Sequence, residues 1–279
     1  MARTQLLIID PQNDFCDLPA GAGGQPALPV TGAHADMQRL ARFIDQAGDT
    51  LDAITITLDS HHRLDIAHPG FWQTAEGGAV SPFTTITASQ LREGLYRPCD
   101  AAALPRTQTY LDALEAAGRY TLMVWPVHCE IGSWGHNVHT EVRAAYNRWE
   151  ERRHAVASKV SKGENPWTEH YSAVQAEVPD EEDAHTRLNR GLIDALDDSD
   201  LLFIAGEASS HCVKASTEHI AEHLPGGHLG RIVLLTDCMS PVTGFEAQAD
   251  GFLAAMQARG LRLMRSTEAL ALLNKPETV

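Results

Sequence analysis

The sequence has few basic side chains and no long apolar run. It contains 22 lysine and arginine residues against 37 aspartate and glutamate residues, so its formal net charge is −15. This negative balance disfavours nucleic acid and anionic membranes as partners. No stretch approaches the roughly 20 apolar residues of a membrane-spanning helix. The apolar start of the chain is soon interrupted by Asp10, so we expect no signal peptide and a cytoplasmic protein.

The sequence also lacks paired cysteines, internal repeats and low-complexity segments. Its five cysteines show no Cys-x-x-Cys spacing, and we expect them to stay reduced in the cytoplasm. Apolar residues make up 43% of the 279, which is enough for one large hydrophobic core. We therefore expect a single domain over residues 1–279.

Short apolar runs alternate along the chain with segments of helical periodicity. Runs this apolar are typical of strands that are covered on both faces. The alternation predicts an α/β fold, with a doubly wound, mainly parallel sheet of about six strands and helices on both faces. The predicted strands are 5–10, 52–59, 121–125, 154–159, 200–206 and 231–237, with a weaker one at 262–266, and the predicted helices are 32–47, 107–117, 136–151, 186–197, 212–223 and 244–259.

The stretch 63–120 interrupts this alternation. It contains a Gly-Gly pair, several prolines and one predicted helix, and it is long for a connection. We expect an insertion that covers the rim of the sheet where the strands end.

Reactive side chains follow five consecutive predicted strands. Binding sites in doubly wound sheets gather at the carboxyl ends of the strands. A single polar residue after a strand is common in solvent-exposed loops. Reactive side chains after five strands in succession, however, predict a functional site. The residues are Asp10, Asp59 with His61, His128, Lys162 and Cys212.

Cys212 comes directly after a strand and a glycine-containing turn, at the predicted start of a helix. A lone cysteine is more often a small buried apolar residue. Free N–H groups at a helix start, however, lower the pKa of a thiol and can donate to an oxyanion. Neighbouring helical residues point about 100° apart, so we do not expect His211 to act as the base for Cys212.

Asp10 and Lys162 are better candidates for partners of the thiol. Partial desolvation at the end of an apolar strand raises the proton affinity of a carboxylate, as a base requires. A nearby lysine would stabilise the ionised groups and the developing negative charge. Taken alone, Asp10 could simply form a turn before Pro11, and Lys162 could be a solvated lysine in a loop. The spacing of the two residues does not decide between these interpretations and the catalytic ones.

Several stretches resemble the signatures of the isochorismatase-like cysteine hydrolases. These are I-D-P-Q-N-D-F at 9–15, S-K-G at 161–163 with H-Y-S-A at 170–173, and G-E-A-S-S-H-C-V at 206–213. D-S-H at 59–61 and W-P-V-H-C-E-I-G-S-W-G-H-N-V-H at 125–139 resemble the nicotinamidase branch. The resemblance covers most of the chain outside 63–120 and implies a parallel sheet between layers of helices.

The resemblance implies a catalytic triad of Asp10, Lys162 and Cys212. It also implies a cis peptide bond before Ala208, whose amide would form an oxyanion hole with that of Cys212. The family usually has a small or apolar residue before this alanine, whereas this chain has Glu207. The carboxylate of Glu207 could contact a lysine, an incoming amine or solvent, and the sequence does not decide among these three contacts.

The nicotinamidase branch carries a divalent metal, and the matching positions are Asp59, His61 and His128, with His68 a looser match. This donor set suits zinc first, and also iron or manganese. General surface polarity is the alternative interpretation of the histidine-rich patch. The resemblance further implies substrate-wall residues, although aromatic residues more often lie in a core: Phe15, Trp125 and Tyr171.

The implied activity is metal-assisted conversion of nicotinamide, or a closely related small aromatic amide, to the acid and ammonia through a thioester. One alternative is a metal-independent hydrolase of another small amide, a carbamoyl compound or a ureide. Another is a catalytically silent ligand-binding relative. Isochorismate cleavage is disfavoured because it does not need the cysteine. Relatives are commonly oligomeric, so we expect a homo-oligomer.

Overall fold

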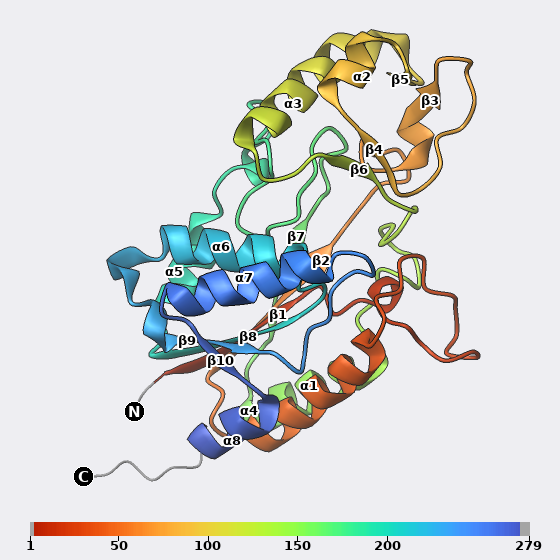
Figure 1. The fold of residues 1–279 in the computed structure, drawn as a ribbon. Helices are drawn as coiled ribbons and strands as arrows, with labels where there is room; N and C mark the ends of the chain where they lie inside the picture. The colour runs from red at the N-terminus through yellow and green to blue at the C-terminus, as the bar shows by residue number, and fades with distance from the viewer. Residues whose placement is uncertain (1–2, 274–279) are drawn as a thin grey trace.

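A six-stranded parallel sheet forms the centre of the computed structural model, which describes residues 3–273 (Figure 1). The strand order is β10-β9-β8-β1-β2-β7. The predicted doubly wound α/β sheet is therefore confirmed. The strands are β1 (Thr4–Ile9), β2 (Ala53–Asp59), β7 (Ser158–Lys162), β8 (Leu201–Gly206), β9 (Ile232–Leu235) and β10 (Arg262–Met264).

Helices cover both faces of this sheet (Figure 1). One layer contains α1 (Ala33–Ala47), α4 (Thr140–Arg153) and α8 (Ser266–Leu273), and the other contains α5 (Arg190–Asp197), α6 (Cys212–His223) and α7 (Glu246–Ala258). Strands β1 and β8 are buried between the layers almost throughout, as their apolar sequences predict. Within the described residues, none of the helices has the length and apolar character needed to span a membrane.

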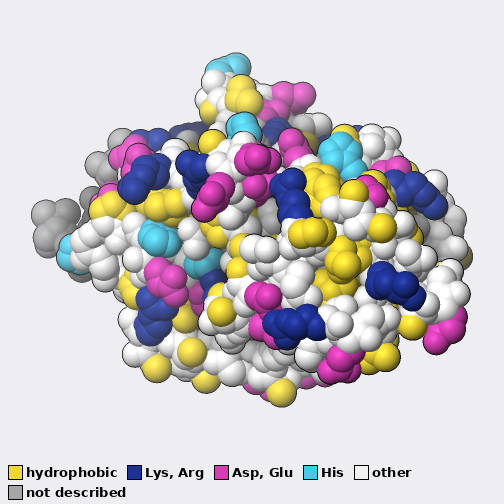
Figure 2. All heavy atoms as spheres, turned by 90° about the horizontal axis from the view of Figure 1, so that it is seen from above, with side chains coloured by type: hydrophobic (Ala, Val, Ile, Leu, Met, Phe, Trp, Pro, Cys, Tyr) yellow, Lys and Arg dark blue, Asp and Glu magenta, His cyan; other side chains and the backbone are white. Residues whose placement is uncertain are grey.

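The insertion forms a lobe beyond one edge of the central layers (Figure 1). It contains β3 (Trp72–Thr74), β4 (Thr84–Ile86), α2 (Ala88–Arg92), β5 (Tyr96–Pro98) and α3 (Leu104–Ala117), and β6 (Leu122–Val124) follows it directly. Its buried side chains form a second hydrophobic cluster around Trp72, Tyr110 and Leu111. On the face seen from this lobe, acidic and basic side chains are interspersed (Figure 2).

The prediction that 121–125 joins the central sheet is wrong. Strand β6 pairs antiparallel with β4, and its Leu122 and Val124 are buried in the cluster of the insertion. The last place in the central sheet is taken by β10, the strand with the weaker sequence signal.

Two other element boundaries differ from the predicted ones because of backbone pairing. Residues 136–139 stay outside α4, since the amide of His139 donates to Pro11 O (2.8 Å) and Val138 bridges to Gln12. Helix α4 runs on to Arg153, so the following strand, β7, occupies 158–162 and not 154–159. Lys162 is therefore the last residue of a strand, directly beside Asp59 in the register of β2 and β7.

Strands β1 and β8 are neighbours at the point where the winding of the sheet reverses. The chain continues from β1 to α1 on one face and from β8 to α6 on the other. Such a switch point opens a crevice at the carboxyl ends of the two strands. Asp10 follows β1 and Cys212 begins α6, so both lie at this crevice.

We expect Gly206→Ala to destabilise the protein strongly. A Cβ atom at Gly206, where φ is +123°, would lie 1.9 Å from Ile9 O on the adjacent strand. Gly244 also has a positive φ of +90°, but no atom lies within 4 Å of its Cβ position. In urea unfolding, Gly244→Ala should cost about 1 kcal/mol, whereas Gly206→Ala should cost about 3 kcal/mol or more. Equal costs would contradict the close packing of β1 against β8.

Candidate active site

Lys162 connects the side chains that the sequence singles out. Its Nζ lies 3.0 Å from Asp10 Oδ2, 2.8 Å from Asp59 Oδ1 and 3.6 Å from Cys212 Sγ. All four residues are at least nine-tenths buried. Burial alone would lower the pKa of Lys162, but Asp10 and Asp59 raise it well above the usual value. The lysine is therefore a fixed cation between two carboxylates and the thiol.

The carboxyl of Asp10 is fixed in orientation by Thr57 and Lys162. Thr57 donates from Oγ1 to Asp10 Oδ1 at 2.6 Å, which leaves Oδ2 facing Lys162. Burial raises the pKa of Asp10, while the charge of Lys162 opposes that rise. A carboxylate with raised proton affinity beside a thiol fits the role of a general base.

Cys212 begins α6, and its own amide and that of Ala208 are free to bind an anion. Within residues 3–273, the amides of Ala208 and Cys212 donate to no protein group. The Glu207–Ala208 peptide bond is cis, as the resemblance implies. Burial, and then Asp10 and Asp59, raise the pKa of the Cys212 thiol, and Lys162 only partly opposes them. The direction is opposite to the one expected from the helix start alone, so the resting thiol keeps its proton.

His211 lies in an aromatic setting beside the cysteine. Its ring contacts Trp125, Tyr171 and Phe245 at centroid distances of 4.8–5.3 Å. Its Nδ1 pairs with the hydroxyl of Ser210 at 2.9 Å. Burial lowers the pKa of His211 to about 4, so the ring is neutral at pH 7. The side chain contributes to the wall of the cavity.

The residues expected to bind a metal meet in one cluster. Asp59 Oδ2 lies 3.1 Å from His61 Nε2 and 3.3 Å from His128 Nε2. His68, the looser match in the sequence, joins them, with its Nε2 3.3 Å from His128 Nδ1. These side chains are all buried. One carboxylate and three imidazoles form a donor set that suits zinc or iron.

Oxygen atoms behind the rings orient this donor set. His61 Nδ1 pairs with Asp65 Oδ2 (3.0 Å), and the Nδ1 atoms of His68 and His128 pair with backbone carbonyls at 3.1 Å and 2.8 Å. Such partners fix the tautomer that leaves Nε2 free for a metal. In the other histidine cluster, His34 pairs with His139, whose Nδ1 has no partner among the described residues. The cluster at Asp59 therefore fits a metal better.

The three aromatic residues expected to contact the substrate line one cavity together with Cys212 and Ala208. Phe15 contacts the ring of His128 (5.5 Å), and Trp125 donates from Nε1 to the hydroxyl of Tyr171 at 3.0 Å. Asp59, His128 and His211 also line this cavity. The candidate nucleophile, two of the candidate metal ligands and the aromatic wall thus surround the same space.

Glu169 is a lining residue that the sequence analysis missed. Its Oε1 accepts from the amide of His170, whereas Oε2 has no partner within the described residues. Burial raises the pKa of Glu169 to about 7. Its position two residues before Tyr171 was the available signal, since both belong to one loop. A carboxyl here can accept a hydrogen bond from a ligand in the cavity.

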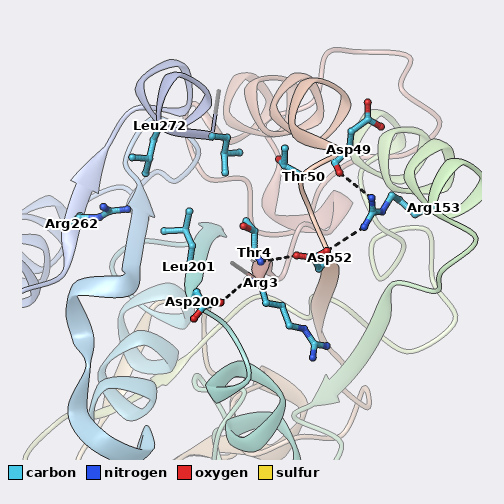
Figure 3. Close-up of a pocket in the computed structure, with 11 residues that line it drawn as sticks. Arg3, Thr4, Asp49, Thr50, Asp52, Arg153, Asp200, Leu201, Arg262 and Leu272 are labelled. Atoms are coloured by element: carbon cyan, nitrogen blue, oxygen red, sulfur yellow. Dashed lines mark hydrogen bonds and ion pairs between the residues drawn. The ribbon is translucent and has the colours of Figure 1, made fainter. Parts of the chain in front are cut away.

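A larger cavity lies at the opposite, amino-terminal edge of the sheet and has a volume of about 980 Å³ (Figure 3). Its carboxylates already have protein partners. Asp52 accepts from the amide of Thr4 and pairs with Arg153, and Asp200 accepts from the amide of Arg3. Among the described residues that line it there is no cysteine or histidine. We therefore place the candidate active site at the carboxyl edge.

Solved structures share this arrangement of layers with the chain. No protein-family model matches the sequence, and no curated protein matches it significantly. The fold is similar to that of the nicotinamidase/pyrazinamidase from Acinetobacter baumanii, with a TM-score of 0.63 and 18% identity over 96% of this chain and 99% of that one. It is also similar to that of the Pyrococcus horikoshii pyrazinamidase in complex with zinc, with a TM-score of 0.54 and 18% identity over 94% of this chain and 99% of that one. An isochorismatase-like hydrolase from Alkaliphilus metalliredigens has a TM-score of 0.52 and 14% identity over 97% of this chain and 99% of that one.

The class that the fold defines is the three-layer α/β proteins with a parallel, doubly wound sheet. Within that class, the chain has the fold of the isochorismatase-like hydrolases, including the nicotinamidases, over nearly its whole length. The resemblance seen in the sequence is thus confirmed at the level of the fold.

Proposed function

We propose that the protein is a metal-assisted cysteine amidohydrolase that converts nicotinamide, or a closely related small aromatic amide, to the acid and ammonia. The observation that carries this proposal is the position of Lys162, within 3.6 Å of Cys212 Sγ and 3.0 Å of Asp10. The free amides of Ala208 and Cys212 support it, because acyl transfer requires donors for an oxyanion.

In the acylation step, Asp10 takes the thiol proton as Cys212 Sγ attacks the amide carbon. Lys162 stabilises the thiolate as it forms. The carbonyl oxygen becomes an oxyanion, which accepts hydrogen bonds from the amides of Ala208 and Cys212. Asp10 then gives its proton to the departing nitrogen, so that ammonia leaves and a thioester remains.

In the deacylation step, water attacks the thioester and its proton passes to Asp10. The second oxyanion forms against the same two amides and collapses, and the acid is released. The proton on Asp10 returns to Cys212 Sγ, so the enzyme ends in its starting state. Phe15 and Trp125 form aromatic walls of the cavity and orient the planar ring of the substrate so that its carboxamide lies next to Cys212.

Asp59, His61, His68 and His128 would hold a divalent metal in this scheme. When bound, the metal would supply Lewis-acid attraction for a ring nitrogen or a water and so orient the substrate. The zinc in the Pyrococcus horikoshii pyrazinamidase supports zinc as the first candidate. Glu169 is placed to accept a hydrogen bond from the ligand in the same cavity.

Removing the metal is expected to abolish ammonia release from nicotinamide, because the ring would lose its anchor. Elemental analysis should find about one equivalent of metal per chain, and adding zinc to chelated protein should restore activity. His61→Ala should lose both metal and activity, whereas the matched variant His139→Ala should keep both. Full activity in metal-free protein would favour the metal-independent hydrolase instead.

A further inference from the structure

Glu207 is fully buried. Glu207 Oε2 accepts a hydrogen bond from the amide of Ser240 at 3.1 Å. The hydroxyl of the same Ser240 donates to Asp36 Oδ2 on α1, and the two carboxyls are close enough for each to shift the pKa of the other. Glu207 therefore contacts neither Lys162 nor solvent, which are two of the contacts that the sequence left open.

Ser240 binds both buried carboxyls, through its amide and its hydroxyl, and one proton between the carboxyls would relieve their repulsion. Burial raises the pKa of Asp36, but its hydrogen bonds from Ser240 Oγ and Arg39 oppose that rise, so we assign the proton to Glu207. Glu207 Oε1 receives no donor within the described residues. Burial raises the pKa of Glu207 well above its usual value, and Asp36 and Asp17 raise it further. A protonated Glu207 satisfies Oε1 by donating to Asp36, whereas two ionised carboxylates would repel each other.

The same region is joined to the candidate oxyanion hole by several backbone contacts. The amide of Gly206 donates to Cys238 O (2.9 Å), and that of Ser209 donates to Ser240 O (2.9 Å). The amide of Val242 donates to the hydroxyl of Ser210 at 3.0 Å. The turn 206–210 is thus attached to the loop 238–242, and Glu207 adds a link from this turn to α1.

We propose that Glu207 is a positioning residue that fixes the turn 206–210, and with it the amides of Ala208 and Cys212, through its contacts with Ser240 and Asp36. This inference rests on the proposed acyl-transfer function, because the turn matters for the amides of its oxyanion hole. Glutamine preserves the contact, since its NH₂ donates to Asp36 and its carbonyl accepts from Ser240. Alanine removes the contact and leaves the Ser240 amide without its partner.

Steady-state kinetics of Glu207→Gln and Glu207→Ala test the inference, with nicotinamide and, separately, p-nitrophenyl acetate as substrates. Glu207→Gln should keep kcat within about 2-fold, whereas Glu207→Ala should lower kcat about 100-fold with little change in KM, as expected for a displaced oxyanion donor. Equal loss in both variants, or an undiminished kcat in Glu207→Ala, would overturn it. Hydrolysis of the ester without hydrolysis of nicotinamide would refute the proposed substrate but leave this test intact.

Thermal unfolding across pH supplies a second readout that needs no substrate. Because the folded-state pKa of Glu207 is raised, its contribution to stability is largest at low pH and is lost as the pH rises from about 4.5 toward the folded-state pKa. The Tm of the wild type should therefore fall relative to that of Glu207→Gln over this range. A difference in Tm that does not change with pH would contradict the shared proton, even if Glu207→Ala fails to fold.

Discussion

Replacing Cys212 by alanine is expected to reduce ammonia release from nicotinamide by about 10⁴-fold or more, because the variant has no nucleophile to form the thioester. Cys212→Ser should also be nearly inactive. A serine hydroxyl is a much weaker acid than a thiol, and Asp10 has to remove its proton. The measurement is a coupled ammonia assay on purified protein with and without bound metal.

The matched control for this prediction is Cys99→Ala, since Cys99 is an exposed cysteine outside the cavity. It should retain wild-type activity. Metal content and Tm of Cys212→Ala should stay close to those of the wild type, because Cys212 is not among the expected metal ligands. Substantial activity in Cys212→Ala would exclude the thioester mechanism, whatever the substrate.

Replacing Lys162 by methionine is expected to abolish activity and to destabilise the fold. The lysine is the cation that lies between the buried carboxylates of Asp10 and Asp59, at 3.0 Å and 2.8 Å. Its removal leaves these carboxylates without a cation between them. We expect this change to lower the free energy of unfolding by about 3–5 kcal/mol. Urea unfolding measures this cost, and the ammonia assay measures the loss of activity.

Lys159→Met is the matched control on the same strand. Lys159 pairs with Glu150 at 3.4 Å, and both side chains are partly exposed to solvent. Such a pair contributes only about 0–1 kcal/mol. Comparable destabilisation by both variants would contradict the central position assigned to Lys162.

Much of the fold could be predicted from the sequence because the central strands are almost entirely apolar. The runs at β1 and β8 have few structural alternatives once both faces are covered. The run at 121–125 is equally apolar, but its side chains are buried in the cluster of the insertion. Periodicity identifies a buried segment and does not say which core buries it.

The candidate site was predictable where its residues follow strands, as Asp10, Asp59 and Cys212 do. Its supporting residues were harder to identify. Asp65 and Glu169 lie in loops, and only the three-dimensional structure brings them to His61 and to the cavity. Thr57 could have been found, because residues two apart on β2 share a face and Thr57 is two before Asp59.

The resting protonation of Cys212 also required the structure. A helix start alone favours the thiolate, whereas burial next to Asp10 and Asp59 favours the thiol. The balance depends on distances that no sequence pattern contains. It also explains why a base is needed: Asp10 must take the proton as the sulfur attacks.

Acid-quenched mass spectrometry of the protein during turnover tests the central claim most directly. After rapid mixing with nicotinamide, we expect a nicotinoyl adduct on the peptide that contains Cys212, which disappears as the substrate is consumed. Asp10→Asn should form little adduct, because the thiol then has no base. Turnover without an adduct at Cys212, or with an adduct on another residue, would contradict the account.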